Sequence, residues 1–244
     1  MIHLSEITNF LDQELKIAEI EDYSLNGLQV EGKKEINRIG FAVDASVESL
    51  LLAKEKDVDM LIVHHGIFWG KQEAICGPLY QKLKVLIENQ ISLYAAHLPL
   101  DIHPNLGNNA QLSKIILGSC GKQIGDYGYI AEVEIELSEV IKRLEKRLDA
   151  RCKVYPCGKE NLKKVALSSG GGASMLSLAI KEGADLFITG EPRLSSYHLA
   201  KESGINLIFC GHYATETVGI KALMAEIQKR FEVDCLFLDL PVDI

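Results

Sequence analysis

The sequence predicts an α/β fold built from two related halves that pack face to face, with a small α+β insertion between them in sequence. Three observations lead to this fold class. Segments of β type and α type alternate along most of the 244 residues. Most β-type segments are continuous apolar runs, as expected for parallel strands covered on both faces. Two long stretches of the chain also resemble each other. A hydrophobic content of 47% is sufficient for one large domain or two small ones.

The first half, residues 1–118, contains three strand-helix alternations. A helix start near Asp44 or Ser46 is indicated by side chains that cap helices. We expect strands at residues 39–43, 60–63 and 91–95, and helices at residues 46–56, 79–89 and 107–116.

The pattern changes near Leu117. Residues 127–137 largely alternate apolar and polar side chains, which indicates a half-exposed strand. An amphipathic helix at 138–148 and a short strand at 152–155 complete the insertion, residues 119–160. The alternation then resumes in the second half, residues 161–244. We expect strands there at 164–168, 186–189, 205–209 and 233–238, and helices at 173–181, 195–202 and 215–229.

The two halves align as an internal repeat. RIGFAVDASVESLLLAKEKDVDMLIVHHG (38–66) matches KVALSSGGGASMLSLAIKEGADLFITGEP (164–192), each with an aspartate, Asp59 or Asp185, before its second strand. ISLYAAHLPLD (91–101) matches INLIFCGHYATE (205–216) when one inserted residue is allowed. Repetition of one supersecondary unit predicts that the two halves share a topology.

Composition excludes several classes of protein. The net charge of −8 and the absence of a basic stripe argue against nucleic-acid binding. The N-terminus has no basic region followed by a long apolar run, and no apolar run could span a bilayer. We therefore expect a cytoplasmic protein with no membrane partner. The scattered cysteines favour reduced, buried thiols, and a metal or redox site at the Cys152/Cys157 pair is the less favoured alternative.

Potential metal ligands lie at or just beyond three predicted strand ends. His64 and His65 follow one strand, His97 precedes Asp101 by four residues after another, and the second half repeats this spacing. Ligand sites in α/β sheets form beyond the carboxyl ends of strands. One such histidine alone is more simply structural, but the repetition favours a metal site. The proposed ligands are His64, His65, Asp101, His212 and Glu216.

Three imidazoles and two carboxylates suit two divalent ions of zinc, manganese, iron or nickel, with coordination positions left open for water or substrate. Adjacent strand residues point to opposite faces, so His64 and His65 reach one cluster only if the strand breaks, as Gly66 permits. His97 is either a ligand or a residue that orients Asp101. We interpret His3 and His103 as surface residues.

Other polar groups near strand ends carry weaker signals. The glycines 170–172 could let backbone N–H groups approach an anion, or could simply form a tight turn. Ser169, Glu191 and His198 could bind substrate, move protons or support the metal ligands, but surface or capping roles are the simpler interpretation. Phe68 and Trp69 could form an apolar wall, a subunit contact or part of the core.

Several motifs together resemble the signatures of the Nif-three-like family, whose members are often called GTP cyclohydrolase 1 type 2 homologues. The resemblance extends over nearly the whole chain and shows no departure at a ligand position. The matching stretches are NGLQVEG (26–32), DAS (44–46), VHHG (63–66) followed by Trp69, AAHLPLD (95–101) with Gly107-Asn108-Asn109, SGGG (169–172), TGE (189–191) and GHYATE (211–216).

The resemblance implies a dinuclear metal site bridged by Glu216, a role for His97 outside the first coordination shell, and a homohexamer built as a trimer of dimers. The family name also implies GTP cyclohydrolysis, and the metal site itself suggests attack by metal-activated water on a nucleotide or a phosphoester. The alternative is a non-enzymatic metal-binding regulator, metal carrier or interaction scaffold. Metal identity, physiological substrate and partner proteins are not specified by the sequence.

Overall fold

The computed structural model describes residues 1–242, which form two compact units. Unit 1 comprises Met1–Leu100 and Ile220–Leu240, and unit 2 comprises Asp101–Gly219 and the few residues after Leu240. Each unit is a sheet with helices, which confirms the predicted α/β class with two sheet-rich halves. The division of the chain into domains 1–118, 119–160 and 161–244 stays a prediction.

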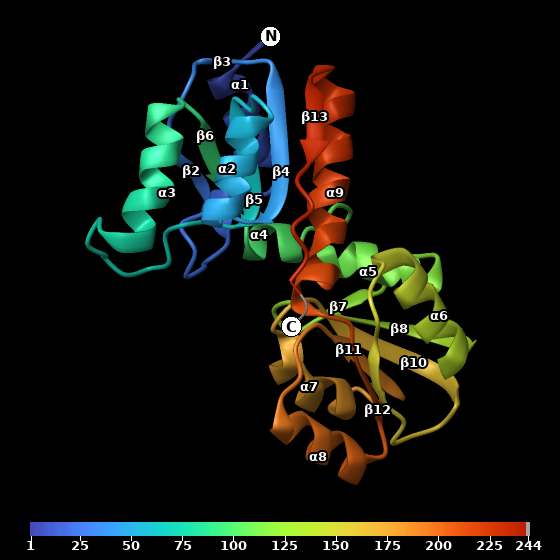
Figure 1. Ribbon diagram of the computed structural model, residues 1–244. Coiled ribbons are helices and arrows are strands. Elements are labelled where there is room, and N and C mark those ends of the chain that lie inside the picture. Colours follow the sequence, from blue (N-terminus) through green and yellow to red (C-terminus); the bar gives the residue numbers. More distant parts are fainter. Residues whose placement is uncertain (243–244) are drawn as a thin grey trace. The chain divides into compact units, whose positions relative to one another are not determined.

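Unit 1 is built on a five-stranded sheet of order β13-β4-β5-β6-β2 (Figure 1). The strands β13, β4, β5 and β6 are parallel, and β2 is antiparallel to β6 at one edge. The last strand of the chain therefore belongs to the first sheet, which the sequence pattern did not indicate. The bounds are β2 Gly27–Val30, β4 Arg38–Asp44, β5 Met60–His65, β6 Ser92–Ala95 and β13 Asp234–Phe237.

Helices cover both faces of this sheet. On one face, Leu93 and Ala95 of β6 belong to a buried cluster with Leu50 of α2 and Leu86 of α3. The intervening residue Tyr94 points to the other face, where its hydroxyl donates to Asp12 of α1 (2.7 Å). The bounds are α1 Leu4–Glu14, α2 Val47–Glu55 and α3 Gly77–Glu88.

Short elements complete unit 1. Ser46 is the N-cap of α2, and its hydroxyl accepts from the N–H group of Ser49 (3.0 Å). The sequence had left Asp44 and Ser46 as alternatives for this cap. The helix α1 was not anticipated, although Leu4, Ile7 and Leu11 form a buried apolar stripe at helical spacing. The remaining elements are β1 Ile2–His3 and β3 Glu35–Ile36, which pair with each other, and the 3₁₀ helix η1 Ile17–Glu19.

Unit 2 is built on a six-stranded sheet of order β7-β8-β10-β11-β12-β9. The central strands β10, β11 and β12 are parallel, while β8 and β9 pair antiparallel on either side of them. The strands of the predicted insertion thus extend the sheet of the second half. The bounds are β7 Lys122–Ile124, β8 Gly128–Glu136, β9 Lys153–Tyr155, β10 Asn161–Ser168, β11 Leu186–Thr189 and β12 Asn206–Phe209.

The two faces of the second sheet are also covered by helices. Leu167 of β10 packs in a cluster with residues of α5 and α6, whereas its neighbour Ala166 packs in another with residues of α7 and α8. The predicted helix at 173–181 begins as the 3₁₀ helix η2 Gly172–Met175 and continues as α7 Leu176–Lys181. The other helices are α4 Leu98–Asp101, α5 Asn108–Leu117, α6 Leu137–Leu148, α8 Leu194–Ser203 and α9 His212–Phe231.

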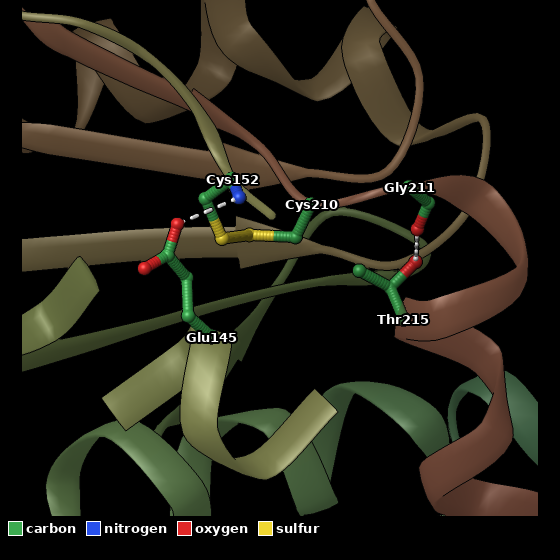
Figure 2. Close-up of a disulfide and its surroundings, with 5 residues drawn as sticks. All are labelled: Glu145, Cys152, Cys210, Gly211 and Thr215. Atoms are coloured by element: carbon green, nitrogen blue, oxygen red, sulfur yellow. Dashed lines mark hydrogen bonds between the residues drawn. A yellow bond between two sulfur atoms is a disulfide. The ribbon is translucent and has the colours of Figure 1, made fainter. Parts of the chain in front are cut away.

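A disulfide links two neighbouring segments at the edge of the second sheet (Figure 2). Cys152 precedes β9 and Cys210 follows β12, and the strand register places them opposite each other with a Cα–Cα distance of 4.4 Å. That distance is typical of a close antiparallel pair. The expectation of reduced thiols is wrong for these two cysteines, because the pairing partner of Cys152 is distant in sequence and Cys157 was the only near neighbour. Cys157 is a free thiol.

Membrane insertion by a helix is not supported within residues 1–242, where every helix is too short or too polar to cross a bilayer.

Candidate metal centre

The strand β5 runs through both adjacent histidines and ends at His65, just before Gly66. The two rings lie with their centroids 4.6 Å apart. Gly66 permits the close packing that follows the strand, because a Cβ atom there would overlap the side-chain amide of Gln29 and lie 2.7 Å from Cβ of Ala95. The strand therefore does not break at the pair, as the sequence reasoning required, but includes both histidines and ends before Gly66.

Each of these histidines is oriented by an oxygen atom on its Nδ1 side. Nδ1 of His64 lies 2.9 Å from the carbonyl oxygen of Ala96, and Nδ1 of His65 lies 2.8 Å from Oδ1 of Asp44. An oxygen acceptor at this distance requires a proton on Nδ1, which leaves the lone pair of a neutral imidazole on Nε2. Metal-binding histidines characteristically carry such an oxygen partner on the non-ligating nitrogen.

His97 has the same arrangement, with a buried carboxylate as its partner. Its Nδ1 lies 3.0 Å from both carboxylate oxygens of Asp22, whose side chain is only 2% exposed. Asp22 also accepts from the side chain of Asn26 (2.9 Å) and from the N–H groups of Ser24 (3.1 Å) and Leu98 (3.0 Å). Burial alone would raise the pKa of Asp22, but the contact with His97 and the hydrogen bonds from Asn26 and Ser24 outweigh burial and hold the pKa well below its usual range.

The three histidines of unit 1 form a group that could hold a metal ion. One ligand atom from each of His64, His65 and His97 lies within 4.8 Å of the others. Trp69 packs beside this group, with ring centroids 5.9 Å from His65 and 5.1 Å from His97. Phe68 instead packs against the buried core of unit 1. Of the alternatives for this aromatic pair, core packing is confirmed for Phe68, whereas an apolar wall or a subunit contact stays a prediction for the exposed Trp69.

Unit 2 supplies a histidine and a carboxylate on the first turn of α9. This helix begins at His212, three residues earlier than the sequence pattern indicated, so His212 and Glu216 lie on one helical face. Nε2 of His212 is 3.0 Å from Oε1 of Glu216, and its Nδ1 is 2.5 Å from Oε1 of Glu191. Burial lowers the pKa of His212, but Glu216 and then Glu191 outweigh burial and raise the pKa to about 9.

Asp101 is a buried carboxylate with a fixed orientation within unit 2. Its Oδ1 accepts from the amide of Asn108 (2.9 Å) and from the hydroxyl of Ser169 (3.0 Å). Ser169 is itself held, because its N–H group donates to Oδ1 of Asn109 (2.7 Å). Ser169 therefore positions a proposed ligand, which is one of the roles near a strand end that the sequence left open.

The glycine turn packs tightly against the first turn of α9. A Cβ atom on Gly170, which has a φ of +51°, would overlap Oε1 of Glu216. The N–H of Gly170 donates to the hydroxyl of Thr215 (3.0 Å), and the N–H of Gly172 donates to the carbonyl of Ser169 (3.1 Å). Since these donors are used within unit 2, the structure favours the tight turn over an anion-binding loop.

The remaining histidines lie apart from these groups. His198 is exposed on α8 beside Tyr197, and the candidate metal groups found among residues 1–242 do not include it. His3 is exposed and caps α1, as a surface role predicts. The surface assignment of His103 is wrong. This residue is buried, and its Nδ1 accepts hydrogen bonds from the N–H groups of Asn105 and Leu106 in the tight turn that follows it (3.3 and 3.0 Å).

Sequence reasoning named Ser169 and Glu191 but missed other residues that orient the ligands. Asp22 stands in an irregular stretch with no motif spacing to the histidine that it binds, 75 residues away. Asp44 was visible only as a possible helix cap and as part of a family motif. Asn108 was visible only as part of a family motif. A hydrogen bond between distant loops leaves no periodic signal in the chain, so only the fold identifies these partners.

Comparison with known proteins matches the chain over its whole length. A family model described as Duf34/NIF3 (NGG1p interacting factor 3) matches residues 2–242. A protein of Archaeoglobus fulgidus named GTP cyclohydrolase 1 type 2 homolog is 42% identical over 250 residues and covers 100% of both chains. A protein of Pyrococcus horikoshii with the same name is 44% identical over 247 residues, with 98% of each chain covered.

Solved structures agree with this assignment. The protein ybgI, described as of unknown function, superposes with a TM-score of 0.94 at 37% identity, and TTHA1606 from Thermus thermophilus with 0.90 at 39% identity. Both matches cover 100% of each chain. Reduced HcgD from Methanocaldococcus jannaschii superposes with a TM-score of 0.88 at 27% identity and covers 98% of each chain.

Proposed function

Because the chain belongs to the Duf34/NIF3 family, we propose that it is a dinuclear metal-dependent hydrolase acting on a nucleotide or a phosphoester. The observation that carries this proposal is the common orientation of three histidines. His64, His65 and His212 each have Nδ1 within hydrogen-bonding distance of a carbonyl or carboxylate oxygen. Nε2 is therefore the nitrogen of each ring that would bind a divalent ion, which on His212 would take the place of the proton shared with Glu216.

The proposed ligands are those expected from the sequence: His64, His65, Asp101, His212 and Glu216, with Glu216 shared by the two ions. Imidazole and carboxylate donors fit zinc, manganese, iron or nickel. When bound, two such ions supply an activated water molecule and a positive environment for developing negative charge. Five protein ligands leave coordination positions open, as a reactive site requires.

The other residues of the chain hold the ligands in place. Glu191 accepts from Nδ1 of His212 and so directs Nε2 toward Glu216. Asn108 and Ser169 both donate to Oδ1 of Asp101, which fixes the plane of that carboxylate. Ligands oriented before the ion arrives do not have to be ordered when it binds, and such partners commonly raise metal affinity 10- to 100-fold.

The choice of substrate class follows the names of relatives. Proteins called GTP cyclohydrolase 1 type 2 homolog are 36–44% identical to this chain. GTP and other nucleotides are therefore the first compounds to test, followed by simple phosphoesters. The non-enzymatic alternative, a metal-binding regulator, carrier or scaffold, would use the same ligands without turnover.

The test combines metal analysis with turnover. The protein is stripped with a chelator, repleted with manganese or zinc, and assayed for bound metal and for hydrolysis of nucleotides and phosphoesters. We expect two ions per chain and metal-dependent turnover that is lost in His64→Ala. His3→Ala is the matched control, because this histidine is exposed and caps α1. One ion per chain or fewer contradicts the dinuclear proposal, and turnover no higher than that of His64→Ala supports the non-enzymatic alternative.

The assembly is also a proposal that follows the family resemblance. A homohexamer arranged as a trimer of dimers would have six times the chain mass of 27.0 kDa. Light scattering coupled to size-exclusion chromatography measures this mass, and a monomer or dimer at micromolar concentration would contradict it. A cytoplasmic location is proposed with it and is checked by fractionation of the native host.

A further inference from the structure

We propose that His97 is an additional metal ligand beside His64 and His65, and that Asp22 is the positioning residue that holds it for this role. This inference rests on the metal binding proposed above and extends the ligand set from five residues to six. It also differs from the role outside the first coordination shell that the family resemblance implied for His97.

The first support is the built environment of His97. Asp22 is nearly fully buried in unit 1, with 2% of its side chain exposed, and both its oxygens face Nδ1 of His97 at 3.0 Å. The backbone of His97 is held as well, because its N–H group donates to Oδ1 of Asn26 (2.7 Å). A buried carboxylate is costly unless it is satisfied, and the contact of both Asp22 oxygens with Nδ1 of His97 fixes the orientation of that ring.

The second support is the chemical state that this contact imposes. A carboxylate on Nδ1 holds the proton there and makes Nε2 a better electron-pair donor, as in the carboxylate–histidine–metal arrangement. His64 and His65 reach the same state through a carbonyl and a carboxylate. The three rings are therefore prepared in the same way, although their oxygen partners come from three different segments of unit 1.

The third support is distance. The ligand atoms of His64, His65 and His97 lie within 4.8 Å of one another. Metal–nitrogen bonds of about 2.0–2.1 Å put neighbouring ligands of one ion about 3–4 Å apart, so small ring movements would bring His97 onto an ion held by either neighbour. Trp69, with its ring centroid 5.1 Å from that of His97, restricts the ring on a further side.

A purely structural role for Asp22 makes a different prediction. Asp22 also binds the N–H groups of Ser24 and Leu98, so it could serve only to tie the loop before β2 to the end of β6. In that case its loss would lower stability and leave metal affinity unchanged. Asp59 offers a matched control, because it is a buried carboxylate of unit 1 that binds two backbone N–H groups at the opposite end of β5.

The test measures zinc affinity and stoichiometry of the full chain by competition with a chromophoric chelator, with thermal unfolding recorded for every variant. We expect His97→Ala and Asp22→Asn each to weaken zinc binding 10-fold or more, and the double variant to be no weaker than His97→Ala alone. Asp59→Asn is expected to lower stability at wild-type zinc affinity. Cobalt substitution gives a second readout, since loss of an imidazole ligand changes the visible spectrum.

The outcomes separate this inference from the function on which it rests. Wild-type zinc affinity and cobalt spectrum in His97→Ala would overturn the ligand assignment, even if Asp22→Asn fails to fold. Equal weakening of zinc binding in Asp22→Asn and Asp59→Asn would overturn the positioning role. If His64→Ala also binds zinc as the wild type does, the proposed metal centre itself fails.

Discussion

The two halves of the molecule share a scaffold and differ in the residues at its carboxyl ends. In each half, an aspartate just before the second strand of the repeat accepts hydrogen bonds from a lysine and from the two backbone N–H groups that enter the first strand. Asp59 does this before β5, with Lys33, Asn37 and Arg38, and Asp185 does it before β11, with Lys159, Lys163 and Lys164.

The ligand ends of the same strands have diverged. Unit 1 has His65 at the end of β5, whereas the equivalent position after β11 is Glu191, which is a partner of His212. His97 is oriented by Asp22 from an unrelated loop, and His212 by a residue of the repeat itself. The comparison teaches that the anchoring end of the repeat is kept, whereas the strand end that carries His64 and His65 in the first half carries a glycine and Glu191 in the second.

The largest expected difference between the halves comes from the disulfide. Cys152 and Cys210 lie 58 residues apart in unit 2, and closing a loop of that length removes about 4 kcal/mol of unfolded-state entropy in the chain-entropy model. We expect Cys152→Ser to lower the free energy of unfolding of unit 2 by up to this amount and to leave unit 1 unchanged. Hydrogen exchange of β10–β12 against β4–β6 measures the two halves separately.

The matched control is Cys157→Ser, which removes a free thiol from the same unit. Thiol titration of the unfolded, unreduced chain should find four of the six cysteines reactive. Six reactive thiols would contradict the disulfide, and equal loss of protection in both sheets would contradict its restriction to unit 2.

The next difference is a dependence of stability on pH in metal-free protein. The pKa of His212 is raised from 6.5 to about 9, because Glu216 and Glu191 outweigh the opposing effect of burial. A raised pKa gives stability that is fully present below about pH 6.5 and is lost as the pH rises through 9. We expect the free energy of unfolding of unit 2 to fall by at most about 3 kcal/mol over this range. Denaturant-induced unfolding in the presence of a chelator measures this change.

The variant His212→Gln should abolish this slope, and Glu191→Gln should reduce it. Unit 1 contrasts with unit 2 because the lowered pKa of Asp22 gives stability that is lost on the acid side instead. An unchanged slope between pH 6.5 and 9 in His212→Gln would show that another group is responsible.

Much of the fold was predictable because it rests on local signals. Apolar runs such as residues 60–63 and the cap at Ser46 are read from neighbouring residues, and the repeat of Asp59 and Asp185 marks equivalent strands. The pairing of β13 with β4 was not predictable, since the sequence of a short strand does not indicate which sheet it joins. The same limit explains the disulfide, because cysteine spacing does not specify connectivity.

The candidate ligands were predictable as residue types at strand ends, as were Ser169 and Glu191, but the residues that orient the ligands from distant loops were not. His64 and His212 follow predicted strands, and this position can be recognised in the sequence. The contact between Asp22 and His97, in contrast, exists only after β2 and β6 have paired. The oxygen partner of an imidazole is a property of the fold, so its identification required the structure.

The smallest expected difference lies in the shared anchor. Asp59→Asn and Asp185→Asn each remove charge-assisted hydrogen bonds to two N–H groups, and we expect each to lower the free energy of unfolding of its own unit by about 2 kcal/mol. The effect should be larger for Asp59, whose side chain is 6% exposed, than for Asp185, whose side chain is 14% exposed. Chemical denaturation and hydrogen exchange of both variants measure this.

Neither substitution should alter zinc affinity. Asp59 stands at the start of β5 and His65 at its end, and a strand rises about 3.3 Å per residue, so the anchor lies far from the ligands. If either substitution weakens metal binding, the two ends of the repeat are coupled through the strands. In that case the difference in metal ligands between the two halves would require a difference between their anchoring aspartates as well. The matching hydrogen bonds of Asp59 and Asp185 argue against such a difference.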